Sequence, residues 1–118
     1  MAEAHILLVE DDPDVVTVLA QVLENAGYRV SSATRRADAQ ALLGKGDVDL
    51  IVTDSMLRGG NGDDIANSGA RRGVPVIMMS GEPDRIARLA GGPAPFLRKP
   101  FRAVELVRLV EQVLAAGC

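Results

Sequence analysis

The feature that most constrains this chain is a regular alternation of short apolar runs with segments of helical periodicity. Such an alternation favours strands that take turns with helices along the whole length. The predicted strands are His5–Val9, Tyr28–Ser31, Asp49–Thr53, Val74–Met79 and Ala94–Leu97. The predicted helices are Pro13–Ala26, Arg35–Leu43, Asp63–Arg71, Pro83–Ala90 and Ala103–Ala116. The predicted order of elements is therefore (βα)5.

Strands that are apolar along their length indicate a parallel sheet whose two faces are both covered by helices. We therefore predict the α/β class, with a doubly wound (βα)5 parallel sheet. The flavodoxin-like strand order 2-1-3-4-5 is one common arrangement of such a sheet and is the one we expect. The length of 118 residues fits one domain, which we place at residues 1–118.

Charge and composition argue against several classes of function. A net charge of −3 and an aromatic content of 3% disfavour a nucleic-acid-binding surface. The apolar runs are far shorter than the roughly 18 residues of a membrane span, and the acidic start does not resemble a signal peptide. The single cysteine allows no disulfide framework. We therefore expect a cytoplasmic protein without nucleic-acid or membrane partners.

Charged and polar side chains follow the predicted strands. In a parallel sheet of this kind ligands bind at the edge where the carboxyl ends of the strands meet. Asp11 and Asp12 follow the first strand, Asp54 the third, Ser80 the fourth and Lys99 the fifth. If the first and third strands are neighbours, the three aspartates converge.

Three converging carboxylates need a compensating cation. Two of them about 4 Å apart repel by roughly 4 kcal/mol at an effective dielectric of about 20. Hard oxygen ligands suit Mg²⁺, which binds a few carboxylates and keeps waters that a phosphate group can replace. A carboxylate nucleophile, a divalent cation, an ammonium and a hydroxyl are the groups that phosphoryl transfer to an aspartate requires. Mg²⁺ is therefore the expected cofactor.

In these motifs the chain resembles the receiver domain of two-component response regulators, over nearly its whole length. The motifs that carry the resemblance are the acidic pair Asp11–Asp12, the phospho-acceptor Asp54, Ser80 followed by Gly81, and Lys99–Pro100. Gly62, eight residues after Asp54, fits the same pattern. Two positions depart from it: Arg58 stands where proline is frequent, and Phe96 replaces the commoner tyrosine.

The resemblance implies a role for each of these residues. Asp54, Lys99 and Ser80 are the expected catalytic residues. Asp12 would bind Mg²⁺ directly, Asp11 partly through water, Asp54 through one oxygen and Met56 through its backbone carbonyl. The resemblance also implies a cis peptide bond between Lys99 and Pro100.

The resemblance further implies a phosphorylation-dependent signalling module that turns over no external substrate. A histidine kinase or histidine phosphotransfer protein would donate the phosphoryl group, and the domain would later remove it by autodephosphorylation. On phosphorylation the Ser80 hydroxyl would move toward the phosphoryl group and Phe96 would rotate inward. A role in core packing is as good an explanation for the presence of Phe96 as a role in the switch.

Two other functions remain open at this point. A haloacid-dehalogenase-type phosphatase also uses aspartate, Mg²⁺ and lysine, but its nucleophile ends the first strand in an Asp-x-Asp arrangement, and here Glu10 stands first. A receiver-like interaction domain without phosphorylation is the other, which the presence of Asp54 and Lys99 argues against. Asp12–Pro13 is also a good helix start, with an N-cap followed by proline.

The last predicted helix has an unusually wide apolar face. On a helical wheel its apolar residues span roughly 220°, whereas an ordinary surface helix needs an apolar stripe of just over about 100°. We expect the surplus edge, at Leu109 or Val104, to lie near solvent and to form, with the fifth strand, a docking surface for a second copy or a downstream protein. The alternative is that the core absorbs this width.

Overall fold

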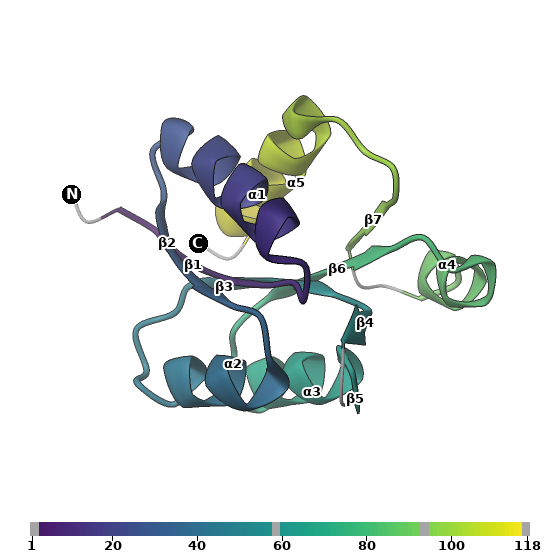
Figure 1. Cartoon of the computed structure of the whole chain (residues 1–118), viewed down its shortest axis with the longest axis horizontal. Helices are drawn as coiled ribbons and strands as arrows, with labels where there is room; N and C mark the ends of the chain where they lie inside the picture. The colour runs from purple at the N-terminus through teal and green to yellow at the C-terminus, as the bar shows by residue number, and fades with distance from the viewer. Residues whose placement is uncertain (1–2, 58–59, 93–94, 117–118) are drawn as a thin grey trace.

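Five parallel strands form one sheet in the order β2-β1-β3-β6-β7 (Figure 1). The structure is a computed structural model that describes residues 3–57, 60–92 and 95–116. The strands of this sheet are β1 His5–Val9, β2 Arg29–Ala33, β3 Leu50–Asp54, β6 Val76–Ser80 and β7 Phe96–Arg98. The order confirms the predicted 2-1-3-4-5 arrangement of the flavodoxin-like fold.

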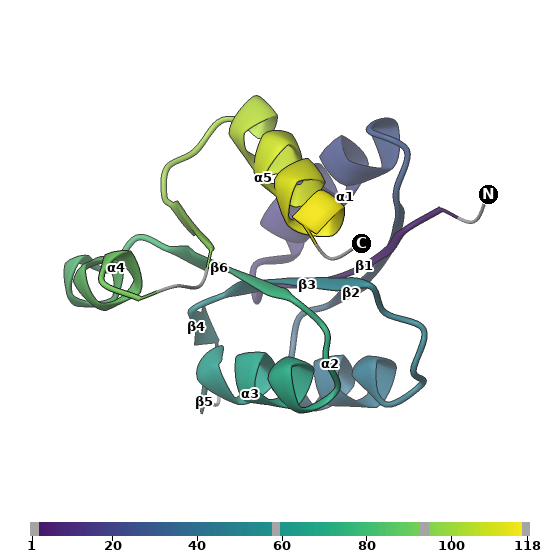
Figure 2. The ribbon, with the colours of Figure 1, turned by 180° about the vertical axis from the view of Figure 1, so that it is seen from behind.

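Four helices cover the two faces of the sheet and a fifth stands beside it. Helices α1 (Pro13–Asn25) and α5 (Ala103–Ala116) lie on one face, and α2 (Arg36–Leu43) and α3 (Asp63–Arg71) on the other (Figures 1 and 2). Helix α4 (Pro83–Ala90) lies beyond the β6–β7 side of the sheet, and none of its residues is buried.

The core has two parts because neighbouring strand residues point to opposite faces of the sheet. Leu8 and Val52 belong to the cluster that contains α1 and α5 residues, whereas Leu7 and Ile51 belong to the cluster beneath α2 and α3. Both faces of β1 and β3 are thus buried, which explains why the successive residues Ile6–Val9 and Leu50–Val52 are apolar.

Strand register brings the carboxyl ends of the strands to one edge. Val9 pairs with Thr53, Asp54 with Met79, and Ser80 with Arg98. The residues at and just beyond these ends therefore lie together, although they come from positions 10 to 99 of the chain.

The structure differs from the prediction in the segment after Asp54. Two short strands that the sequence analysis does not predict, β4 (Met56–Leu57) and β5 (Gly60–Asn61), pair antiparallel in this segment. Residues 58–59, and with them Arg58, lie outside the described part of the chain. Several element ends are shifted by one or two residues, and Asp54 closes its strand rather than following it. Among the described residues no helix has the length and apolar character needed to cross a membrane.

Candidate functional site

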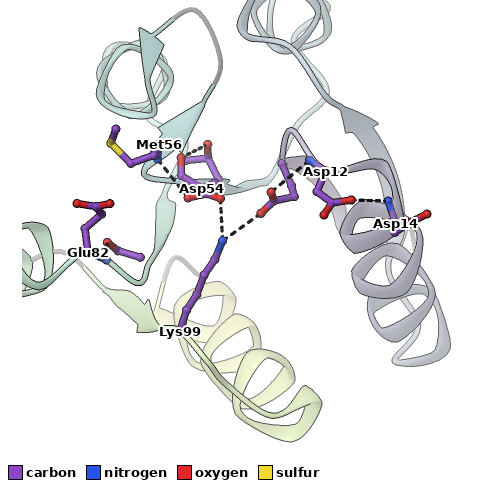
Figure 3. Close-up of polar contacts among 9 residues, drawn as sticks. Asp12, Asp14, Asp54, Met56, Glu82 and Lys99 are labelled. Atoms are coloured by element: carbon purple, nitrogen blue, oxygen red, sulfur yellow. Dashed lines mark hydrogen bonds and ion pairs between the residues drawn. The ribbon is translucent and has the colours of Figure 1, made fainter.

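The candidate site is built around Lys99, which reaches two carboxylates from different strand ends. Its Nζ lies 2.7 Å from Asp54 Oδ2 and 3.2 Å from Glu10 Oε2 (Figure 3). Asp54 is the last residue of β3, Glu10 follows β1 directly, and Lys99 follows β7. The backbone N–H of Lys99 also donates to the carbonyl of Ser80 at 2.8 Å, which holds the lysine beside the end of β6.

The acidic group contains Glu10, Asp11 and Asp54. One carboxylate oxygen from each lies within 4.8 Å of the others, and Glu10 and Asp54 are buried. Asp11 and Asp54 of the predicted trio belong to this group, and Glu10 is its third member. The metal-binding role expected of Asp12 stays a prediction.

Asp12 has a different position, at the start of α1. Its carboxylate accepts the N–H of Asp14 at 2.9 Å as the N-cap of that helix, followed by Pro13 at the first helical position (Figure 3). A helix start of this kind directs the carboxylate to the first turn. The Asp-Pro pair was the signal in the sequence that could have assigned Asp12 to the helix and Glu10 to the site.

The pKa of the Glu10 carboxyl group is raised. Burial, followed by a hydrogen bond with Asp54 and the charge of that aspartate, raises the pKa of Glu10 from 4.5 to about 7. Lys99 and the N–H of Asp12, which donates to Glu10 Oε1 at 3.3 Å, oppose this rise. Glu10 therefore binds a proton more readily than an ordinary glutamate.

Lys99 keeps its charge in this setting. Burial would lower the pKa of its ammonium, but the hydrogen bond and charge of Asp54, together with Glu10, outweigh burial and raise the pKa. The site therefore contains a permanent positive charge in contact with Asp54.

The backbone around Asp54 is tightly constrained. The N–H of Met56 donates to Asp54 Oδ1 at 3.1 Å, and the N–H of Gly62 donates to the carbonyl of Ser55 at 2.9 Å. A Cβ at Gly62 would collide with the carbonyl oxygen of Asp54. Since φ of Gly62 is negative, close approach rather than an unusual backbone conformation requires glycine here.

The predicted switch residues lie on the neighbouring strands. Ser80 ends β6 and is fully buried, and its Oγ accepts the N–H of Glu82 at 3.3 Å. Phe96 begins the edge strand β7 and is half-buried. The peptide bond between Lys99 and Pro100 is cis, as the resemblance implied.

Comparison with known families gives a direct assignment. The family model described as the response regulator receiver domain matches residues 6–111. The chain belongs to this family. It is a receiver domain of two-component signalling, and thus a signalling module rather than a substrate-turnover enzyme, which removes the haloacid-dehalogenase alternative.

Individual relatives agree with the assignment. The chain is 38% identical over 107 residues to "Transcriptional regulatory protein TcrA" of Mycobacterium tuberculosis, a match that covers 86% of this chain and 42% of that protein. The chain thus spans less than half the length of this relative. Among solved structures, the non-phosphorylated HemR receiver domain of Leptospira biflexa has a TM-score of 0.82 and 31% identity, with 96% of this chain and 95% of that chain covered.

A second solved structure supports the fold. The response regulator receiver protein from Sinorhizobium medicae has a TM-score of 0.88 and 26% identity, and the match covers 98% of each chain. The similarity extends over the complete sheet and its helices. The receiver architecture is thus present throughout the described residues.

Proposed function

We propose that this receiver domain accepts a phosphoryl group on Asp54 from a phosphohistidine and later returns it to water. The observation that carries the proposal is the 2.7 Å contact between Lys99 Nζ and Asp54 Oδ2 inside a buried acidic group. It supports Asp54 as the acceptor because this carboxylate combines a strand-end position with a fixed counter-charge.

The proposed transfer is an in-line displacement. An oxygen of Asp54 bonds to phosphorus as the bond from phosphorus to the donor's imidazole nitrogen breaks, and the imidazole keeps the electron pair and takes up a proton. In the later dephosphorylation, water attacks phosphorus as the bond from phosphorus to the Asp54 oxygen breaks. The water loses a proton, and inorganic phosphate and the free carboxylate are released. Lys99 offsets the charge on the phosphoryl oxygens in both steps.

The donor set fits Mg²⁺. Glu10, Asp11 and Asp54 present hard carboxylate oxygens within 4.8 Å of one another, and we propose the backbone carbonyl of Met56 as a further ligand. In this proposal Glu10 takes the place that the sequence prediction gave to Asp12. When bound, the ion would supply positive charge to the phosphoryl oxygens and relieve repulsion among the carboxylates.

The proposed switch involves Ser80 and Phe96. The Ser80 hydroxyl would leave the N–H of Glu82 and donate to a phosphoryl oxygen on Asp54, and Phe96 would rotate inward from its half-buried position. The support is that Ser80 lies at the end of the strand that pairs with β3, and that Phe96 on β7 pairs with Met78, two residues before Ser80.

We propose a histidine kinase or a histidine phosphotransfer protein as donor, and β7 with α5 as a surface for a second copy or a downstream target. Val104 supports this surface because it is 43% exposed. Leu109, the other predicted edge residue, is half-buried and packs against the core, so the core absorbs that side of the wide apolar arc. The single variants Val104→Glu and Leu109→Glu are each compared with the wild type by light scattering in the presence of beryllofluoride. Val104→Glu should reduce self-association or partner binding.

We propose that residues 1–118 act as one receiver domain, although the curated relatives are longer. We propose a cytoplasmic location without nucleic-acid partners, supported by the single cysteine and the low aromatic content.

Intact-mass measurement tests the assignment of Asp54. Incubation with acetyl phosphate and Mg²⁺ should add one phosphoryl group to the wild type and none to Asp54→Asn. Asp11→Asn, which keeps the acceptor but weakens the acidic group, should slow the addition. Retention of the mass shift by Asp54→Asn would show that another residue is the acceptor, and failure of the wild type to bind beryllofluoride would favour an interaction domain without phosphorylation.

A further inference from the structure

Helix α4 is the least anchored helix of the described structure. Each of the other four helices buries at least two residues, whereas α4 buries none. Its apolar residues Ile86 and Leu89 are only half-buried, and the helix packs against the short edge strand β7 (Figures 1 and 2). Because little apolar area holds α4, individual polar contacts have a large share in fixing its position.

One of these contacts joins α4 to α3. Arg85 Nη1, in the first turn of α4, lies 3.4 Å from Asp63 Oδ1 at the first position of α3. The Arg85 side chain is only 16% exposed, whereas the Asp63 side chain is 50% exposed, so the pair is shielded from water on the arginine side. Asp63 directly follows Gly62, which packs against the carbonyl of Asp54. The pair therefore ties α4 to the backbone segment beside the proposed acceptor.

A second contact reaches the same turn from β6. The N–H of Glu82, the N-cap residue of α4, donates to Ser80 Oγ, and Glu82 itself makes no side-chain cap. Ser80 is the proposed switch hydroxyl. If it turns toward a phosphoryl group, the first turn of α4 loses this hydrogen bond and keeps the ion pair with Asp63.

We propose that the Arg85–Asp63 ion pair is a latch that holds α4 in its resting position and opposes activation. This inference rests on the proposed phosphorylation of Asp54. By linkage, a contact made only in the resting position weakens the binding of any ligand that favours the displaced position, and its removal strengthens that binding by the same factor. The latch thus sets how readily phosphorylation moves α4.

The test measures beryllofluoride affinity, in the presence of Mg²⁺, together with hydrogen exchange of α4. Asp63→Asn should bind beryllofluoride about two- to five-fold more tightly than the wild type, the range expected for one partly shielded ion pair. Its α4 amides should exchange faster before the ligand is added. Asp64→Asn is a matched control, because Asp64 is the next residue of the same helix turn and pairs with Arg36 of α2 instead. It should leave both readouts unchanged.

Variants of the other partner identify the pair itself. Arg85→Gln should reproduce both effects of Asp63→Asn, and the double variant should bind no more tightly than either single one, since both remove the same contact. Two results would overturn the latch while leaving the proposed function intact. One is that Asp63→Asn and Asp64→Asn have equal effects. The other is that Asp63→Asn and Arg85→Gln both show wild-type beryllofluoride affinity and wild-type hydrogen exchange. Failure of the wild type to bind beryllofluoride would overturn the proposed function and the latch with it.

Discussion

The ammonium of Lys99 bridges Glu10 and Asp54, at 3.2 Å and 2.7 Å, and so links the ends of three strands of the sheet. Two carboxylates near each other are tolerated here because a fixed cation lies against both and because Glu10 binds a proton readily. Because of this bridge, the positive charge of Lys99 lies close to where the oxygens of a phosphoryl group on Asp54 would be.

Replacement of Lys99 should slow phosphorylation and leave the fold intact. Lys99→Ala should remain folded, because the side chain is a third exposed and packs at the edge of the sheet. Phosphorylation by acetyl phosphate should slow by about 10²-fold, the usual effect of removing one group that stabilises charge in the transition state. Intact-mass kinetics measures the rate and circular dichroism checks the fold. Phosphorylation at the wild-type rate would contradict the role given to Lys99.

Glu10 should make the stability of the metal-free protein depend on pH. Its pKa is about 7 in the folded state against 4.5 for the ordinary group, so between these values the folded state binds more protons than the unfolded state. The free energy of unfolding should therefore fall as the pH rises through this window, by about 3 kcal/mol. Urea unfolding in EDTA at several pH values measures it.

The matched variant for this pH dependence is Glu10→Gln. It cannot ionise and should flatten the fall in stability between pH 4.5 and pH 7. An unchanged slope in the variant would mean that another group is responsible.

Substitutions of Asp12 and Glu10 should have different effects, the first on stability and the second on Mg²⁺ binding. Asp12→Ala should lower stability by about 1 kcal/mol through loss of the α1 cap and leave Mg²⁺ affinity nearly unchanged. Glu10→Gln should weaken Mg²⁺ binding, since it removes one charge from the acidic group. Calorimetric titration measures the affinities. A larger loss of affinity in Asp12→Ala than in Glu10→Gln would restore the original assignment of Asp12.

Gly62 should tolerate no side chain. Gly62→Ala would place a methyl group against the Asp54 carbonyl, and the backbone must shift to relieve the collision. Such overpacking costs about 1–3 kcal/mol. Thermal unfolding should show the loss, and acetyl phosphate should react more slowly because Asp54 moves. Gly81→Ala is a suitable control, because a Cβ there would make only ordinary contact with Lys99.

The pattern of the sequence was sufficient to predict the sheet. Runs such as Ile6–Val9 are apolar at every position, as in strands covered on both faces, so the alternation with helices led to the correct class, a parallel α/β sheet. The positions of Asp54, Ser80 and Lys99 at one edge followed, because parallel strands end on the same side. The family resemblance added their expected roles.

Tertiary structure decided which acid joins Asp11 and Asp54, and where the last helix is exposed. Three acids follow β1 in succession, and the choice between Glu10 and Asp12 depends on where the chain leaves the sheet and enters α1. Asp12 turns to cap the helix, whereas Glu10 points into the buried site toward Lys99. Residues adjacent in sequence face different surroundings at such a junction, and composition cannot rank them. Packing across elements, which no local pattern encodes, sets their burial and hence their chemistry.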